Sequence, residues 1–169
     1  NREDDNMSET RRTPLYARHR SLGAKMVEFV GWDMPIMYPR GIVEEHLSTR
    51  KTAGLFDVSH MGRFIVKGHE ATPFLQHVLT NNAEALDRRE AGAQYTLIPN
   101  ESGGAVDDAY LYRFVQDAFL LVVNAANRDK DWEHLQEASR SYSELDLIDC
   151  TDQISMIALQ GPRSRHIME

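Results

Sequence analysis

Two adjacent acids, Asp107 and Asp108, interrupt an otherwise apolar and aromatic stretch at residues 105–112. If this stretch is a strand, its side chains alternate, so the two carboxylates point to opposite faces and one of them points towards a core. Asp108 would share its face with Val106 and two tyrosines. Because a buried carboxylate is costly unless it is hydrogen-bonded or binds something, this pair is a candidate for acid–base chemistry. The alternative is that both acids lie in water at the end of a hairpin.

Other polar residues carry weaker signals. Tyr95 and Asn124 fall at strand positions where a ligand could be bound, although each residue alone favours a structural role. Ser59 and His60 follow an acid, but neighbours in sequence do not define a triad, and the chain has no Gly-x-Ser-x-Gly motif. The seven histidines show no metal-ligand spacing. We therefore expect no metal site.

Composition excludes several classes of protein. The 169 residues carry 19 basic and 26 acidic side chains, a net charge of −7, which argues against a broad nucleic-acid surface or a polybasic membrane anchor. The single cysteine, Cys150, cannot form an internal disulfide and is expected to be a small buried residue. The longest apolar run, residues 118–123, is far shorter than the ~18 residues that indicate a membrane helix.

The elements that must position these residues follow from periodicity and turn signals. Thr13, before a proline, predicts a capped helix that ends at Gly23, and residues 1–12 are expected to be a disordered leader. Glycine and proline at 31–35 predict a break in regular structure. The remaining elements expected before residue 90 are a strand at 24–30, a helix at 41–52, a strand at 63–67 and a helix at 70–79.

The second half predicts a β-meander at residues 93–124, with a Gly103-Gly104 turn between its first two strands. Asn127 is expected to cap a helix that runs to Ser139. Strands are expected at 145–148 and 154–159, followed by a helix that has barely two turns when the chain stops. Antiparallel strands mixed with helices predict the α+β class, with mainly antiparallel sheets and flanking helices.

At this point a set of motifs in a fixed order resembles a known family. The motifs are Thr-Pro-Leu-Tyr at 13–16, Gly-Ala-Lys-Met-Val at 23–27, Gly-Trp-Asp-Met-Pro at 31–35, Gly-Leu-Phe-Asp-Val-Ser-His-Met-Gly at 54–62, Tyr-Thr-Leu at 95–97, Asn-Glu-Ser-Gly-Gly-Ala-Val-Asp-Asp at 100–108, Val-Val-Asn-Ala-Ala-Asn at 122–127 and Leu-Gln-Gly-Pro at 159–162. Together they resemble the aminomethyltransferases, the T-protein family of the glycine cleavage system.

The resemblance implies a tetrahydrofolate-dependent transfer. The family takes an aminomethyl group from the lipoyl arm of the H-protein, releases ammonia and forms 5,10-methylenetetrahydrofolate. By motif match, Asp108 is implied to be the key carboxylate near the folate N5/N10 edge, and it is the one residue to which the resemblance gives a catalytic role. Tyr95 and Asn124 match pterin-pocket positions, and Met61 matches an apolar residue beside the folate. The implied location is the bacterial cytoplasm, or the mitochondrial matrix in a eukaryote.

The chain also departs from the family. Family members are about twice as long and have three domains around a folate channel, so residues 13–169 are expected to be a truncated N-terminal part that is inactive alone. The charged segment Asp87-Arg88-Arg89-Glu90 appears as a lengthened loop. Two alternatives stay open, a folate-dependent demethylase on the same scaffold and a non-catalytic folate-binding accessory protein. The oligomeric state is not predicted.

Overall fold

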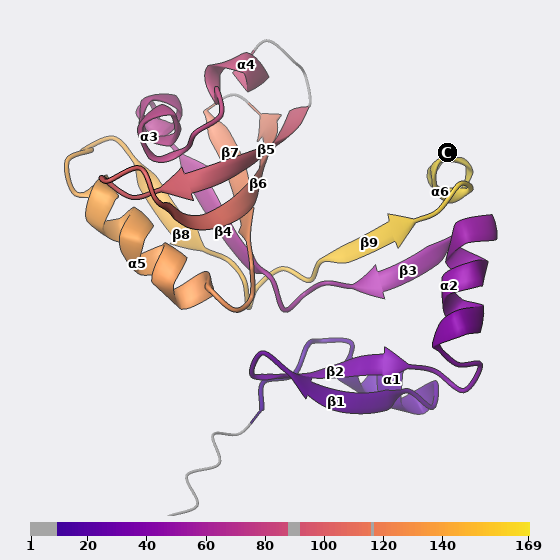
Figure 1. Ribbon diagram of the computed structural model, residues 1–169. Coiled ribbons are helices and arrows are strands. Elements are labelled where there is room, and N and C mark those ends of the chain that lie inside the picture. The colour runs from indigo at the N-terminus through magenta and orange to yellow at the C-terminus, as the bar shows by residue number, and fades with distance from the viewer. Residues whose placement is uncertain (1–9, 88–91, 116) are drawn as a thin grey trace, which may run out of the picture. The chain divides into compact units, whose positions relative to one another are not determined.

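The computed structural model describes residues 10–87, 92–115 and 117–169 (Figure 1). The chain divides into two compact units. Unit 1 combines residues 10–60 with residues 155–169, and unit 2 is the continuous stretch Met61–Ile154. Helices alternate with antiparallel sheets in both units. The predicted α+β class is therefore confirmed.

Unit 1 contains two small sheets and three helices. Strand β1 pairs with β2, and β3 pairs with β9, both antiparallel. The elements are α1 (Tyr16–Ser21), β1 (Lys25–Phe29), β2 (Trp32–Met37), α2 (Ile42–Lys51), β3 (Gly54–Asp57), β9 (Ile157–Gln160) and α6 (Ser164–Met168). Of the expected leader, residues 1–9 lie outside the described residues, and Arg11 exchanges backbone hydrogen bonds with residues 31 and 33.

The predicted break at residues 31–35 is wrong, because most of this segment belongs to strand β2. Val30 and Gly31 both have positive φ, 52° and 78°, and they form the two-residue turn between β1 and β2. A turn with two positive φ angles matches the twist of a hairpin. Pro35 is tolerated because, among the described residues, β2 forms a ladder with β1 alone, apart from a single bridge between Trp32 and Arg11, so its missing N–H interrupts no second ladder.

A buried polar network holds α1 to β3. The Asp57 carboxylate accepts hydrogen bonds from Thr13 Oγ1 at 2.6 Å, His19 Nε2 at 2.9 Å and the Ser59 backbone N–H at 3.0 Å. His19 Nδ1 lies 2.7 Å from the Tyr38 hydroxyl oxygen. Thr13 was predicted to cap the helix, but α1 begins at Tyr16 without a side-chain cap, and the Thr13 hydroxyl instead donates to this carboxylate.

We expect Asp57→Asn to destabilise unit 1 by about 1–3 kcal/mol at neutral pH, since an amide has one acceptor oxygen and turns its N–H₂ towards a donor. Burial acts to raise the pKa of Asp57, but hydrogen bonds from His19, Ser59 and Thr13 lower it overall. The stabilisation is therefore present above the ordinary Asp pKa of about 3.9 and is lost as the pH falls through the lower folded value. Hydrogen exchange of the α1 and β3 amides, compared between neutral and acidic pH, measures it.

The control for this prediction is Glu44→Gln, because Glu44 lies exposed on α2. This substitution should change the free energy of opening measured by hydrogen exchange by less than about 0.5 kcal/mol. Equal protection of the α1 and β3 amides in Asp57→Asn and in the native protein would contradict the structural role of the network.

Unit 2 is a five-stranded antiparallel sheet in the order β5-β6-β7-β4-β8, with helices packed against it. The meander predicted at residues 93–124 is present as β5, β6 and β7. The elements are β4 (Gly62–Lys67), α3 (Ala71–Val78), α4 (Glu84–Asp87), β5 (Gly92–Pro99), β6 (Ala105–Val115), β7 (Ala118–Val123), α5 (Arg128–Ser139) and β8 (Asp146–Asp149). Most of the lengthened segment at 87–90 lies outside the described residues.

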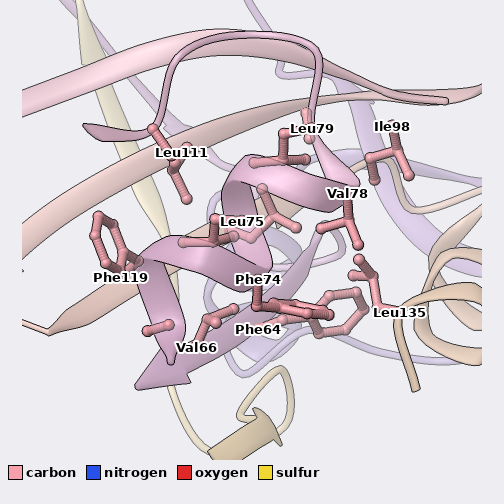
Figure 2. Packing of buried hydrophobic residues seen from close by; sticks show 14 of the residues in the cluster. Phe64, Val66, Phe74, Leu75, Val78, Leu79, Ile98, Leu111, Phe119 and Leu135 are labelled. Carbon is pink, nitrogen blue, oxygen red and sulfur yellow. The ribbon is translucent and has the colours of Figure 1, made fainter. Parts of the chain in front are cut away.

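The core of unit 2 lies between one face of this sheet and its helices (Figure 2). Alternate residues of β4, Phe64 and Val66, are fully buried, as are alternate residues of β7. Helix α3 adds apolar side chains at the helical spacing i, i+3, i+4 and i+7, and α5 adds Leu135. The sheet thus has one core face, which leaves the other face to carry a site.

Two further observations bear on the sequence predictions. Cys150 is buried with 2% of its surface exposed, as expected for a small apolar residue. In the part of the chain that the structure describes, each helix is too short or too polar to span a bilayer.

Candidate functional site

Asp108 and Asn124 lie side by side at one end of the unit 2 sheet. Ala109 of β6 pairs with Val123, the last residue of β7, so Asp108 and Asn124 are the next neighbours in this antiparallel register. Asn124 Nδ2 donates to Asp108 Oδ1 at 2.9 Å and lies 3.3 Å from the Asp108 carbonyl oxygen. The strand register therefore brings together two residues that sequence reasoning proposed separately.

The two acids point to opposite faces, as the alternation predicts. Asp107 pairs with Ile98, which is fully buried, whereas Asp108 pairs with Leu97, which is 38% exposed. The inward carboxylate is therefore Asp107, and Asp108 lies on the face away from the core. Both acids are partly buried, so the alternative that they lie fully in water is wrong.

The prediction that Val106 shares the Asp108 face is also wrong, because Val106 packs against the core. A register shift between Ile98 and Pro99 gives β6 an extra residue there, and such a bulge reverses the alternation. The two tyrosines do share the Asp108 face. Tyr110 and Tyr112 have ring centroids 5.1 Å apart.

Tyr95 joins the same face. It pairs with Tyr110 across β5 and β6, and the two side chains are 54% and 41% exposed. The Asp108 carboxylate raises the pKa of Tyr95, chiefly because it accepts a hydrogen bond from the phenol. Asp108 thus lies beside an exposed aromatic surface. One ligand could donate a hydrogen bond to its carboxylate and pack against the tyrosine rings.

Met61 lies at the same end of the sheet. It precedes Gly62, the first residue of β4, which pairs with Val123. Asp108, Asn124 and Met61 therefore follow one another across the strand order β6-β7-β4. The Met61 carbonyl oxygen accepts a hydrogen bond from Arg63 Nη1 at 2.6 Å.

Arg63 is a residue of this region that sequence reasoning missed. Its side chain is buried, with 1% exposed, and the guanidinium donates to the carbonyl oxygens of Met61 and Thr151. Burial lowers the pKa of Arg63 from its usual value. This buried guanidinium therefore ties the backbone at Met61 to the backbone at Thr151. The sequence signal was a charged residue inside an otherwise apolar strand.

Asp131 is the second missed residue. It lies on α5, is fully buried, and shares a helix face with Leu135 at spacing i, i+4, which is the signal that could have found it. Its carboxyl meets that of Asp107, which also accepts a hydrogen bond from Asn124 Nδ2 at 3.1 Å. Burial, followed by the hydrogen bond and charge of Asp107, raises the pKa of Asp131 to about 8.

Asn127 contributes to this arrangement in a way that differs from the prediction. It immediately precedes α5, but its side chain makes no capping hydrogen bond and instead bonds Asp107. Burial acts to raise the pKa of Asp107, yet hydrogen bonds from Asp131, Asn124 and the Asp108 backbone, with a further one from Asn127, hold it below its usual value. Asp107 is thus the charged member of the pair of buried acids.

The described residues were also compared with the side-chain clusters that bind metal ions. Over residues 10–87, 92–115 and 117–169, His, Cys, Asp and Glu side chains form no group of three or more that could hold a metal ion. The chemistry available is that of a carboxylate, an amide and aromatic side chains.

Comparisons with known proteins identify the family and agree with this fold. Residues 15–169 match the family described as the GCVT N-terminal domain. An aminomethyltransferase from Thermus thermophilus is 46% identical over 159 residues, which cover 94% of this chain and 44% of the relative. An aminomethyltransferase from Pelodictyon phaeoclathratiforme is 48% identical over 159 residues, with 94% and 42% covered.

A solved structure gives the same result in three dimensions. The crystal structure of the glycine cleavage system aminomethyltransferase T from Bartonella henselae superposes with a TM-score of 0.85 at 37% identity, and the match covers 94% of this chain and 43% of that one. The chain spans less than half the length of the relatives that it matches. It belongs to the aminomethyltransferase family, of which it carries the GCVT N-terminal domain.

Proposed function

We propose that the full-length protein is a tetrahydrofolate-dependent aminomethyltransferase of the glycine cleavage system, with a lipoylated H-protein as its partner. The observation that carries this proposal is the place of Asp108, a carboxylate held by Asn124 on the open face of the sheet beside exposed aromatic residues. Family membership supports the same assignment. The relatives named above are all aminomethyltransferases, so the demethylase and accessory-protein alternatives are not favoured.

The exposed face suits a reduced folate as substrate. Tyr95 and Tyr110 present aromatic surface on which a flat heterocycle can stack, and Met61 adds an apolar group at the same sheet end. The Asp108 carboxylate is an acceptor for ring N–H groups. We propose Tyr95, Asn124, Met61 and Asp108 as the folate contacts that this chain supplies.

The proposed transfer moves one carbon without oxidation. The methylene carbon passes from the lipoyl sulfur to N5 and N10 of tetrahydrofolate, the nitrogen leaves as ammonia, and the two folate N–H protons end on the thiol and the ammonia. Positive charge develops at the carbon and nitrogen during this exchange. A fixed carboxylate at Asp108 orients the folate amine and stabilises that charge, and it costs no reorganisation when the reaction occurs.

The test is ammonia release from aminomethyl-loaded H-protein by the full-length protein, with and without tetrahydrofolate. We expect release that needs both the protein and tetrahydrofolate. Folate binding without release from the loaded H-protein would overturn the aminomethyltransferase assignment in favour of a demethylase or a folate-binding accessory protein.

A further inference from the structure

The three oxygen atoms where Asp107 and Asp131 meet form a buried cluster that the proposed transfer does not use. Asp107 Oδ2 and both carboxyl oxygens of Asp131 are buried without a hydrogen-bond donor from another described residue. Two carboxylates cannot satisfy each other, because each has only acceptor atoms when it is ionised. One proton on Asp131 removes the repulsion and lets one Asp131 oxygen donate a hydrogen bond to Asp107 Oδ2, so two of the three oxygens are then paired.

We infer that Asp131 is a positioning residue that stays protonated and donates a hydrogen bond from its carboxyl O–H to Asp107 Oδ2, so that Asp107 holds the Asn124 amide against Asp108. This inference rests on the proposed function for its catalytic consequence. The chain of contacts runs from the core face of the sheet to its open face. Asn124 Nδ2 is shared between Asp107 Oδ1 at 3.1 Å and Asp108 Oδ1 at 2.9 Å.

Burial decides which of the two acids keeps the proton. Asp131 is fully buried on α5, whereas Asp107 receives hydrogen bonds from the Asn124 and Asn127 amides that favour its charged form. The charged groups that face Asp131 are Asp107 and Asp108 on β6 and its neighbour Lys130. Lys130 Nζ donates to the Val106 carbonyl oxygen at 2.7 Å, which ties α5 to the same strand.

A protonated Asp131 predicts the direction in which folding stability changes with pH, and this direction can be measured. Because the folded state binds a proton that the unfolded state releases above its ordinary Asp pKa, this contribution to stability is complete at low pH. It is lost progressively as the pH rises above the ordinary Asp pKa of about 3.9, and the loss is complete above the folded pKa of about 8. The lost proton also leaves Asp107 facing a second charge, which should disturb the Asn124 contact with Asp108.

Two substitutions of Asp131 separate the effect of its hydrogen-bond donor from the effect of its side-chain volume. Asp131→Asn keeps a donor towards Asp107 and cannot ionise, whereas Asp131→Leu keeps the size but offers no hydrogen bond. Asp129→Asn is the matched control, since Asp129 lies in the same first turn of α5 with its side chain exposed. All are made in the full-length protein, and each is measured for folate-dependent turnover, thermal midpoint against pH, and ¹³C NMR titration of the native Asp131 carboxyl.

We expect Asp131→Asn to keep turnover at pH 7. It should lose the fall in thermal midpoint that the native protein shows between about pH 4 and pH 8, and the fall in turnover that it shows near pH 8. Asp131→Leu should lose turnover by about ten- to a hundredfold while remaining folded, because a displaced Asn124 misplaces the reacting carboxylate. Asp129→Asn should match the native protein in all three measurements.

Three results would overturn the inference. One is a native Asp131 carboxyl that titrates near the ordinary value of about 3.9, and another is full turnover in Asp131→Leu. The third is an equal loss of turnover in Asp131→Asn and Asp131→Leu. A native protein with no folate-dependent ammonia release would instead overturn the proposed function. The carboxyl titration and the pH dependence of the thermal midpoint would still decide whether Asp131 stays protonated.

Discussion

Asp108→Asn should reduce turnover by about 10²–10⁴-fold, the range typical for loss of a positioned acid–base or charge-stabilising group. Asparagine is nearly isosteric, and its side-chain oxygen can still accept from Asn124 Nδ2, which lies 2.9 Å from Asp108 Oδ1 in the native protein. The fold should therefore remain intact while the negative charge is lost. The measurement is tetrahydrofolate-dependent ammonia release by the full-length variant, beside its circular dichroism and thermal midpoint.

Asp107→Asn is the internal comparison for this experiment. It lies one residue away but on the core face, where it contacts Asn124 rather than the exposed aromatic surface. We expect a smaller loss of turnover than for Asp108→Asn. Activity within a few-fold of native in Asp108→Asn would refute the role of that carboxylate, and equal losses at the two positions would refute the assignment of faces.

Phe64→Ala should destabilise unit 2 by about 3–5 kcal/mol, because it removes a fully buried ring and leaves a cavity. Phe64 is one of the buried side chains of the core (Figure 2). Its ring centroid lies 4.8 Å from that of Trp132 on α5. Hydrogen exchange of the β4 and β7 amides is the suitable measurement, since a chain of two units need not unfold in one step.

Lys67→Ala at the end of the same strand is the control, because its side chain is 47% exposed and its ion pair with Asp146 is a surface pair at 3.6 Å. Lys67→Ala should lower the stability of unit 2 by less than about 1 kcal/mol. If Phe64→Ala left exchange of β4 and β7 as slow as in the native protein, the core assignment would be wrong.

The sequence was informative where local rules and tertiary structure agree. The meander at residues 93–124 alternates with a period of two, and Gly103 adopts φ of +81° in the turn that its glycine pair indicated. The same alternation correctly separated Asp107 from Asp108. Strand β2 was missed because a proline usually ends a strand. The sheet topology of the described residues is needed to show that Pro35 interrupts no second ladder.

The parts of the site that were missed depend on contacts across the fold. Pattern alone does not show that a bulge beside Ile98 moves Val106 to the core face. Nor does it show that the Thr13 hydroxyl donates to Asp57, which is far away in sequence, rather than to its own helix. The contact of Asp131 with Asp107 needs α5 to be docked on the sheet, so it follows from the tertiary structure only.

The discontinuity of unit 1 has a consequence for synthesis in the cell. Asp57 of β3 pairs with Ile157 of β9, about a hundred residues later, and all of unit 2 is made in between. At roughly 5–20 residues per second, β3 has no strand partner for about 5–20 s after it leaves the ribosome. During that time the β3 edge lacks its β9 partner, and an unpaired strand edge is a template on which other nascent chains can pair and aggregate.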